Sequence, residues 1–163
     1  MSKLCQLACL IVVASASLAA QVASSTVETS GMVGLASGET AQLNLLNPGF
    51  PATATAIPAT CSATVSFLDA SGKVLKSAVL TIASGKSAAL TLTDREANLT
   101  GTERSEIRAT LAIAPVPVAV TNPVAATCTY VKTLEVYDNL SLRTLLALGD
   151  FRDVTVPTLS VAP

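Results

Sequence analysis

The sequence predicts an all-β protein, folded as an antiparallel β-sandwich of about seven to nine strands with one short helical turn and one disulfide. Three observations lead to this fold class. Apolar and polar residues alternate along several stretches, Thr and Val are frequent within them, and turn residues separate them at regular intervals. Short alternating strands with such spacing are typical of two packed antiparallel sheets.

Seven stretches have the length and the pattern of strands. They are 39–47, 61–69, 74–82, 86–93, 106–114, 129–137 and 142–148. The second of them shows the pattern clearly, because Cys61, Ala63, Val65 and Phe67 share one face and hydroxyl side chains occupy the other. Turns are predicted between strands, where Gly and Asp favour a reversal of the chain. They fall at Ser37-Gly38, 69–72, Ser84-Gly85 and Asp138-Asn139.

Two places depart from the strand pattern. Asp94 is a helix-capping residue followed by helix-tolerant residues, so we expect one helical turn over 94–98 that crosses between the sheets, with Leu99 packing onto the core. Lys132 has the same parity as the apolar residues Leu134 and Val136. Either the strand bulges at Lys132 or this residue lies at the rim of the sheet.

The N-terminus has the features of a secretory signal peptide. Lys3 precedes an apolar run at 7–13, and small residues follow at 14–20. Cleavage after Ala19 satisfies the small-residue rule, and cleavage after Ala16 is a second option. An uncleaved membrane helix is the alternative, but the apolar run is short for a bilayer span. We therefore expect an extracytoplasmic protein, secreted or periplasmic, with no membrane span after cleavage.

These signals divide the chain into segments. The expected division is a signal peptide at 1–19, a loose segment at 20–30, the sandwich at 31–149, and a tail or edge strand at 150–163. Within the last segment, 154–156 has the composition of an edge strand.

The expected export makes the cysteine count informative. Cys5 and Cys9 leave with the signal peptide, so the mature chain keeps Cys61 and Cys128. Two cysteines in an exported chain usually form a disulfide, and two free buried thiols are the alternative. Two distant cysteines alone do not make a zinc site.

The composition excludes several classes of function. The chain has 163 residues, a formal net charge of −1 and no His. Without His there is no Ser-His-Asp triad and no His-containing zinc site. A charge so close to zero gives no electrostatic attraction for nucleic acid. We expect neither a cofactor nor a bound metal.

Acidic residues are the remaining candidates for catalysis. Two pairs have the composition of a glycoside-hydrolysing site, but we interpret them as solvated turn residues. They are Asp94 with Glu96, and Glu103 with Glu106. Asp69 and Asp138 stand at turns and are candidates for binding calcium. Neither heads a loop with enough oxygen ligands for calcium, so we interpret both as Asx-turn residues.

The order of four segments resembles a known family. They are Gly-Glu-Thr-Ala-Gln-Leu-Asn-Leu at 38–45, Asn-Pro-Gly at 47–49, Val-Ser-Phe-Leu-Asp-Ala-Ser-Gly-Lys-Val-Leu at 65–75, and Ser-Gly-Lys-Ser-Ala at 84–88. This order is similar to that of bacterial cell-surface immunoglobulin-like domains of the adhesion-associated, CARDB-like type. The late Glu-Val-Tyr-Asp at 135–138 resembles a segment of exported bacterial proteins with a Cys-containing strand. The resemblance covers 31–148. It implies an immunoglobulin-like fold outside the cytoplasm and supplies no catalytic residues.

The cysteines also predict where a working surface lies. A disulfide holds two Cα atoms within about 7 Å. Cys61 and Cys128 each stand at the start of a strand, so we expect the loops that enter these strands, 48–60 and 115–127, to lie at one end of the sandwich. Both loops are long, uncharged, apolar and interrupted by Pro, which favours a binding surface over a simple connection. Packing of the loops on their own domain is the alternative. The predicted interaction residues are Phe50, Pro51, Ile57, Pro58, Pro115, Val116, Pro117, Val118 and Pro123.

Three functions are compatible with these residues. The preferred one is a non-enzymatic exported module that binds an unknown protein or cell-surface partner through the loops at 48–60 and 115–127. A structural subunit of a cell-surface appendage or coat is the second, and a small hydrolase is a remote third. The hydrolase requires a polar cleft with converging titratable groups.

Overall fold

The computed structural model describes residues 26–49, 60–114 and 128–154, and every regular element within them is a strand. The strands are β1 (Thr26–Ser30), β2 (Val33–Ala36), β3 (Glu39–Leu46), β4 (Thr60–Asp69), β5 (Val74–Ala83), β6 (Ser87–Thr93), β7 (Arg104–Ile113), β8 (Val131–Asp138), β9 (Thr144–Leu148) and β10 (Phe151–Val154). The expected signal peptide lies outside the described residues. Nowhere in the described ranges is there a helix long and apolar enough to cross a membrane.

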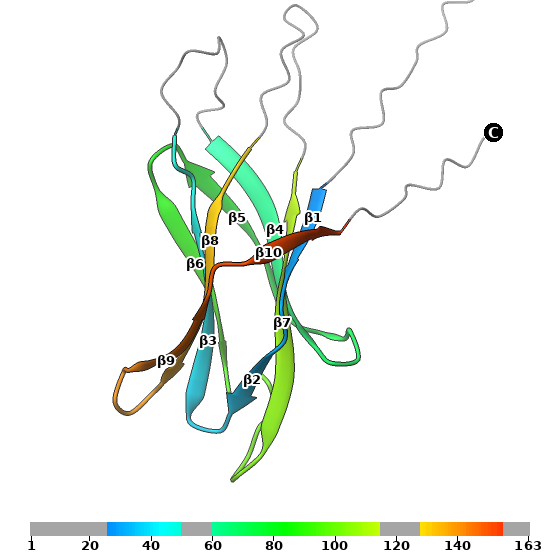
Figure 1. Cartoon of the computed structure of the whole chain (residues 1–163), viewed down its shortest axis with the longest axis vertical. Helices are drawn as coiled ribbons and strands as arrows, with labels where there is room; N and C mark the ends of the chain where they lie inside the picture. Colours follow the sequence, from blue (N-terminus) through cyan, green and yellow to red (C-terminus); the bar gives the residue numbers. More distant parts are fainter. Residues whose placement is uncertain (1–25, 50–59, 115–127, 155–163) are drawn as a thin grey trace, which may run out of the picture.

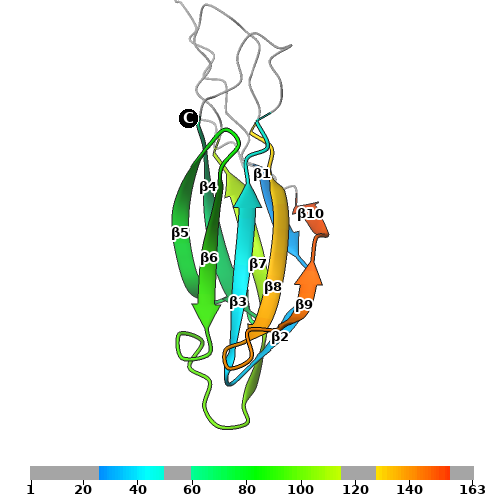
Figure 2. The same ribbon diagram turned by 90° about the vertical axis from the view of Figure 1, so that its left-hand side faces the viewer.

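The strands form two antiparallel sheets that face each other as a sandwich (Figures 1 and 2). Sheet A has the order β10-β1-β7-β4-β5, and β2 also pairs with β7. Sheet B has the order β6-β3-β8-β9. The predicted all-β sandwich is thus confirmed.

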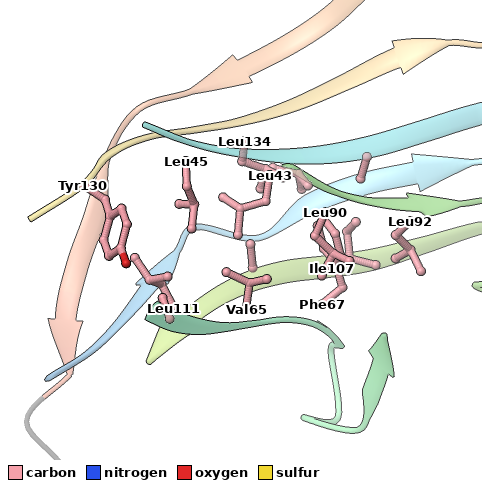
Figure 3. Close-up of a cluster of buried hydrophobic side chains, with 14 of the residues drawn as sticks. Leu43, Leu45, Val65, Phe67, Leu90, Leu92, Ile107, Leu111, Tyr130 and Leu134 are labelled. Atoms are coloured by element: carbon pink, nitrogen blue, oxygen red, sulfur yellow. The ribbon is translucent and has the colours of Figure 1, made fainter. Parts of the chain in front are cut away.

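One face of each sheet is apolar, and the two apolar faces form a single core (Figure 3). Leu43, Leu45 and Leu134 of sheet B face Val65 of sheet A. All four side chains are almost fully buried. Full burial of an aliphatic or aromatic side chain contributes about 1.5–3 kcal/mol relative to exposure. The alternation along each strand therefore fixes which face packs inward and which meets solvent.

The seven predicted stretches correspond to β3 through β9. The alternating stretches at 39–47 and 61–69 coincide with β3 and β4 to within one residue. Strands β1 and β2 were not predicted, and the C-terminal edge strand occupies Phe151–Val154 rather than 154–156. Sheet A therefore includes residues on both sides of the 31–149 range.

The chain between β6 and β7 crosses from sheet B to sheet A, as expected for 94–98. Its structure is a set of hydrogen-bonded turns: Ala97 N donates to Thr93 O at 3.0 Å, and Leu99 N donates to Asp94 O at 2.9 Å. These bonds make one turn of helical type without a regular helix. Leu99 packs against the core as predicted.

Lys132 lies at the rim of the sheet. The pairing of β8 with β3 runs without a shift from Val131 to Asp138, so no bulge occurs at Lys132, which stands opposite the buried Leu45. Strand β9 pairs with β8 only from Leu134 onward, which leaves Lys132 at an uncovered edge. Its side chain faces inward and forms an ion pair with Glu28 of β1. The rim interpretation is therefore correct, and the inward charge has a partner.

Candidate functional site

The disulfide between Cys61 and Cys128 joins the two sheets at one end of the sandwich. Cys61 is the second residue of β4 in sheet A, and Cys128 precedes β8 in sheet B. Their Cα atoms are 5.7 Å apart, and both side chains are buried. This pairing was predicted from the sequence and is confirmed.

The ends of four strands meet around this disulfide. In sheet A, Ala114 N donates to Ser62 O at 3.1 Å, so the end of β7 lies beside the start of β4. In sheet B, Leu46 pairs with Val131, so the end of β3 lies beside the start of β8. The segments 50–59 and 115–127 connect these strand ends (Figure 1). The strand ends that flank the two predicted loops therefore lie together around the disulfide.

The predicted interaction residues themselves lie outside the described residues. They are Phe50, Pro51, Ile57, Pro58, Pro115, Val116, Pro117, Val118 and Pro123. Apolar surface is nevertheless present at their anchors, because Leu46 and Val131 are both exposed side chains and stand directly opposite each other on the outer face of sheet B.

Asn47 fixes the start of the first loop. Its side-chain Nδ2 donates to Ile82 O at 3.0 Å, and its backbone N donates to Lys86 O at 3.0 Å. The Asn47 carbonyl accepts from Gly85 N at 2.8 Å, and its Oδ1 accepts from Gly49 N at 3.3 Å. Asn47 is buried, so these bonds hold the loop anchor firmly against the β5–β6 turn.

Gly49 is required where the first loop leaves the sandwich. Its φ of +57° lies in the left-handed region, and a Cβ at this position would come within 2.1 Å of Ser84 Oγ. Both the conformation and the close approach favour Gly. Neither Asn47 nor Gly49 was assigned a role from the sequence. The available signal was the Asn-Pro-Gly run, because an Asn side chain often bonds to the backbone two residues later.

Tyr130 lies at the end of the core beneath this cluster. Figure 3 shows its ring next to Leu45 and Leu111. The side chain is buried, and its hydroxyl has no hydrogen-bond partner among the described residues. Burial raises the pKa of the Tyr130 hydroxyl. The aromatic ring therefore closes the core at the disulfide end.

A polar cluster lies between the sheets near β10. Lys132 pairs with Glu28, and the Lys132 Nζ lies 5.8 Å from the centre of the Phe151 ring. Side-chain exposure is 18% for Lys132 and 10% for Glu28. Burial lowers the pKa of the Lys132 ammonium, while the Asp153 carboxylate acts in the opposite direction. The pair ties β8 of sheet B to β1 of sheet A.

Of the four acidic residues considered for catalysis, Asp94, Glu96 and Glu103 act in turns. The turn interpretation is wrong for Glu106, which lies within β7 and forms an exposed ion pair with Arg104, 3.8 Å from Nε to Oε1. Asp94 Oδ2 accepts from Gly38 N at 2.7 Å, and Glu96 Oε1 pairs with Lys76 Nζ at 2.5 Å. Glu103 Oε2 accepts from Thr100 N at 2.8 Å. Hydrogen bonds lower the pKa of all three carboxyl groups, with the Gly38 amide, the Lys76 ammonium and the Thr100 amide as the largest causes.

Asp69 and Asp138 form the predicted Asx turns. Asp69 Oδ1 accepts from Ser71 N at 2.9 Å, and Asp138 Oδ1 accepts from Ser141 N at 2.6 Å. Among residues 26–49, 60–114 and 128–154, no group of three or more Cys, Asp or Glu side chains is placed to hold a metal ion.

Comparison of the chain with protein-family models, with curated proteins and with solved structures finds no match. The arrangement of the chain's own residues is therefore what bears on its function.

Proposed function

We propose that this chain is a non-enzymatic, exported immunoglobulin-like module that binds a protein or a cell surface through its apolar loops at 48–60 and 115–127. The observation that supports this most is the meeting of four strand ends around the Cys61–Cys128 disulfide. Loops that start from one rigid end of a scaffold form one surface, which is the usual arrangement of binding loops on sandwich domains.

The chemistry of the loops indicates the kind of partner. They carry no charged residue and are rich in Pro, Ala and Val, and the exposed Leu46 and Val131 add apolar surface on sheet B next to them. Apolar patches of this kind mark contacts with proteins or membranes rather than with polyanions. A partner with an apolar binding surface is therefore favoured.

The proposed location outside the cytoplasm is supported by the disulfide and by the N-terminal sequence. Disulfides persist in oxidising compartments such as the periplasm and the extracellular space. The signal-peptide pattern of 1–19 points the same way.

The test compares partner capture by matched variants of the oxidised protein. The first variant carries Phe50→Ser with Ile57→Ser, and the second replaces 50–57 by a short Gly/Ser linker. The control is Val79→Ser, which removes an exposed apolar side chain from the middle of β5, away from the loops. Circular dichroism and thermal unfolding verify that each variant folds.

We expect both loop variants to lose the partner captured from the extracytoplasmic fraction, whereas the Val79→Ser control retains it. Capture that is unchanged in both loop variants would overturn the proposed function.

A further inference from the structure

Lys132 and Glu28 place an amine and a carboxyl group in direct contact between the two sheets. Lys132 Nζ pairs with Glu28 Oε2, an oxygen that is bonded to the carboxyl carbon Cδ. The backbone fixes both positions. In sheet B, Lys132 stands opposite the fully buried Leu45. In sheet A, Glu28 stands opposite the fully buried Leu111. The fold therefore holds the two reactants of an amide bond beside each other.

The surroundings of this pair are more apolar than those of an ordinary surface ion pair. The ring of Phe151, which packs against the core, lies 5.8 Å from Lys132 Nζ. Side-chain exposure is 18% for Lys132 and 10% for Glu28, against 30% for Lys76 and 41% for Glu96 in a second Lys–Glu pair. Water is thus largely excluded from the inward pair. This matters because water is the product of amide formation and the reactant that reverses it.

Burial makes both charges of the pair costly. A buried ammonium and a buried carboxylate lose hydration that their mutual attraction only partly replaces. Burial lowers the pKa of the Lys132 ammonium, and the Asp153 carboxylate acts in the opposite direction. The uncharged amine, which is the nucleophilic form, is favoured by this burial. An amide carries no charge, so its formation removes the cost of burying the two ions.

A second carboxyl group faces the same pair. Asp153 of β10 stands directly opposite Glu28 in the antiparallel pairing of β10 with β1. Residues directly opposite each other place their side chains on the same face of a sheet. Asp153 is exposed, whereas Glu28 is buried. Asp153 is therefore placed to carry protons between the Lys132 amine and the Glu28 carboxyl group.

We propose that Lys132 and Glu28 condense into an amide bond that links β8 of sheet B to β1 of sheet A. The Lys132 ammonium gives a proton to the Asp153 carboxylate, which passes it to the Glu28 carboxylate. The bond between Lys132 Nζ and Glu28 Cδ then forms, and one Cδ–O bond breaks. The leaving hydroxyl takes a second proton from the nitrogen and departs as water. Asp153 regains its original charge, and no oxidant or cofactor is consumed.

Two physical effects favour the forward reaction. Groups held in a reactive geometry behave as if they were present at effective concentrations of about 10⁵–10⁸ M. The loss of two buried charges adds to this effect. Because Lys132 lies at the rim of its sheet and is partly exposed, the released water has a route to solvent. The ion pair is the state that precedes the reaction, so the chain folds first and is cross-linked afterwards.

The amide secures the N-terminal strand. Strand β1 points Glu28 and Ser30 inward in place of apolar side chains, so it gains little from apolar burial. The disulfide joins β4 to Cys128, four residues before Lys132, and leaves β1 without a covalent link to sheet B. The amide supplies that link, and unlike the disulfide it persists in a reducing solution.

Mass spectrometry of the mature, reduced protein tests the proposal. We expect the wild type, after incubation at neutral pH, to be lighter than its sequence by one water molecule. The matched control is Lys76→Arg at the exposed pair, which should show the same loss. Lys132→Arg keeps the positive charge beside Glu28 and should retain the full mass of its sequence, because a guanidinium is not deprotonated. Circular dichroism verifies that both variants fold.

Peptide mapping locates the bond. The protein is first reduced and alkylated, because the disulfide would otherwise join the same two peptides. The chain has no Lys or Arg between Lys3 and Lys73, so Glu28 lies in one tryptic peptide, and trypsin does not cut after a modified Lys132. We expect one joined product in which fragmentation places the bond between Glu28 and Lys132. A wild type of full mass, a water loss that persists in Lys132→Arg, or a bond from Lys132 to Asp153 would each overturn the proposal.

The rate of the mass change tests the part assigned to Asp153. We expect Asp153→Asn to slow the loss of water by about 10²-fold and to reach the same final mass, since proton transfer by a placed side chain contributes at least this factor. An unchanged rate would contradict the proton-carrying part of Asp153. Because Asp153→Asn delays the reaction, it also keeps the protein in the ion-paired form, in which the unfolding of Lys132 variants is compared.

Discussion

Lys132 of β8 reaches across the sandwich and pairs with Glu28 of β1, so that an ion pair connects the two sheets beside the Phe151 ring. Both residues point inward from positions where alternation predicts apolar side chains. Removing one partner leaves the other charge buried without its counter-ion, which is more costly than removing both.

We therefore expect Lys132→Met to lower the free energy of unfolding by about 3 kcal/mol, and Lys132→Met with Glu28→Leu to recover most of this loss. Urea unfolding of the two single variants and the double variant measures the coupling. The control is Lys76→Met, which breaks the exposed Lys76–Glu96 pair and should cost less than about 1 kcal/mol. If Lys132→Met and Lys76→Met lower the free energy of unfolding equally, the inward ion pair stabilises the fold no more than an exposed pair does.

The disulfide makes a separate contribution to stability. The bonded cysteines are 67 residues apart, and the chain-entropy model assigns a loop of this size about 4 kcal/mol. We expect Cys61→Ala with Cys128→Ala to lower the free energy of unfolding by about this amount, as measured by urea unfolding. Reduction of the wild type should have the same effect, and reduction of the double variant should have none.

Gly49 gives a direct test of the loop anchor. Ala at Gly49 adopts the left-handed conformation at a cost of about 1–2 kcal/mol and also clashes with Ser84 Oγ. The control is Gly85→Ala, because Gly85 has a φ of +72° but open space around its Cβ position. We expect Gly49→Ala to be the more destabilising change. Adding Ser84→Ala should recover the difference, as measured by thermal unfolding.

Tyr130→Phe removes the buried hydroxyl that has no partner among the described residues. Burying an unpaired hydroxyl costs about 1–3 kcal/mol, so its removal should leave stability unchanged or raise it by about 1 kcal/mol. Tyr130→Ala is the contrasting variant, because it also removes the ring from the core and should cost about 3 kcal/mol or more. A clear loss of stability in Tyr130→Phe would contradict this account.

The sequence predicts most of the fold because alternation is strongest where one face is apolar and the other polar. Strands β3 and β4 satisfy this condition, and their limits were predicted closely. Strands β1 and β2 do not, since Glu28 and Ser30 are the inward residues of β1 and Gly31-Met32 interrupts the pattern. Inward polar residues are recognisable only when their partners are known: Ser30 Oγ accepts from Ala109 N at 2.9 Å, and that partner is 79 residues away.

The candidate site was predictable to the extent that covalent geometry determines it. Cys61 and Cys128 define which strand ends meet, whatever the details of packing. The role of Asn47 depends instead on Ile82 and Lys86, which come close only when β3 and β6 pair. The exposed leucines of β9 were equally hidden, because a Leu-rich run has the same sequence pattern whether or not another sheet covers it.

The Asx turn at Asp138 predicts a loss of stability in acid. Hydrogen bonds from the Ser141 amide and hydroxyl and from the Leu140 amide stabilise the ionised carboxylate and hold the pKa of Asp138 below its ordinary value. Between its ordinary and its folded pKa, the unfolded chain binds more protons at this site than the folded chain does. The contribution of Asp138 to stability is therefore fully present above its unfolded pKa of about 4 and is lost as pH falls through the lower, folded pKa.

Urea unfolding from pH 7 downward tests this with Asp138→Asn, in which the amide Oδ1 still accepts the turn's hydrogen bonds but does not titrate. We expect the stability of this variant to fall less steeply in acid than that of the wild type. Since hydrogen bonds cause the shift, the difference between the two proteins should persist at about 1 M salt, where exposed charge pairs are screened within about 3 Å. An acid loss of the same steepness in both proteins would show that the turn does not favour the ionised carboxylate.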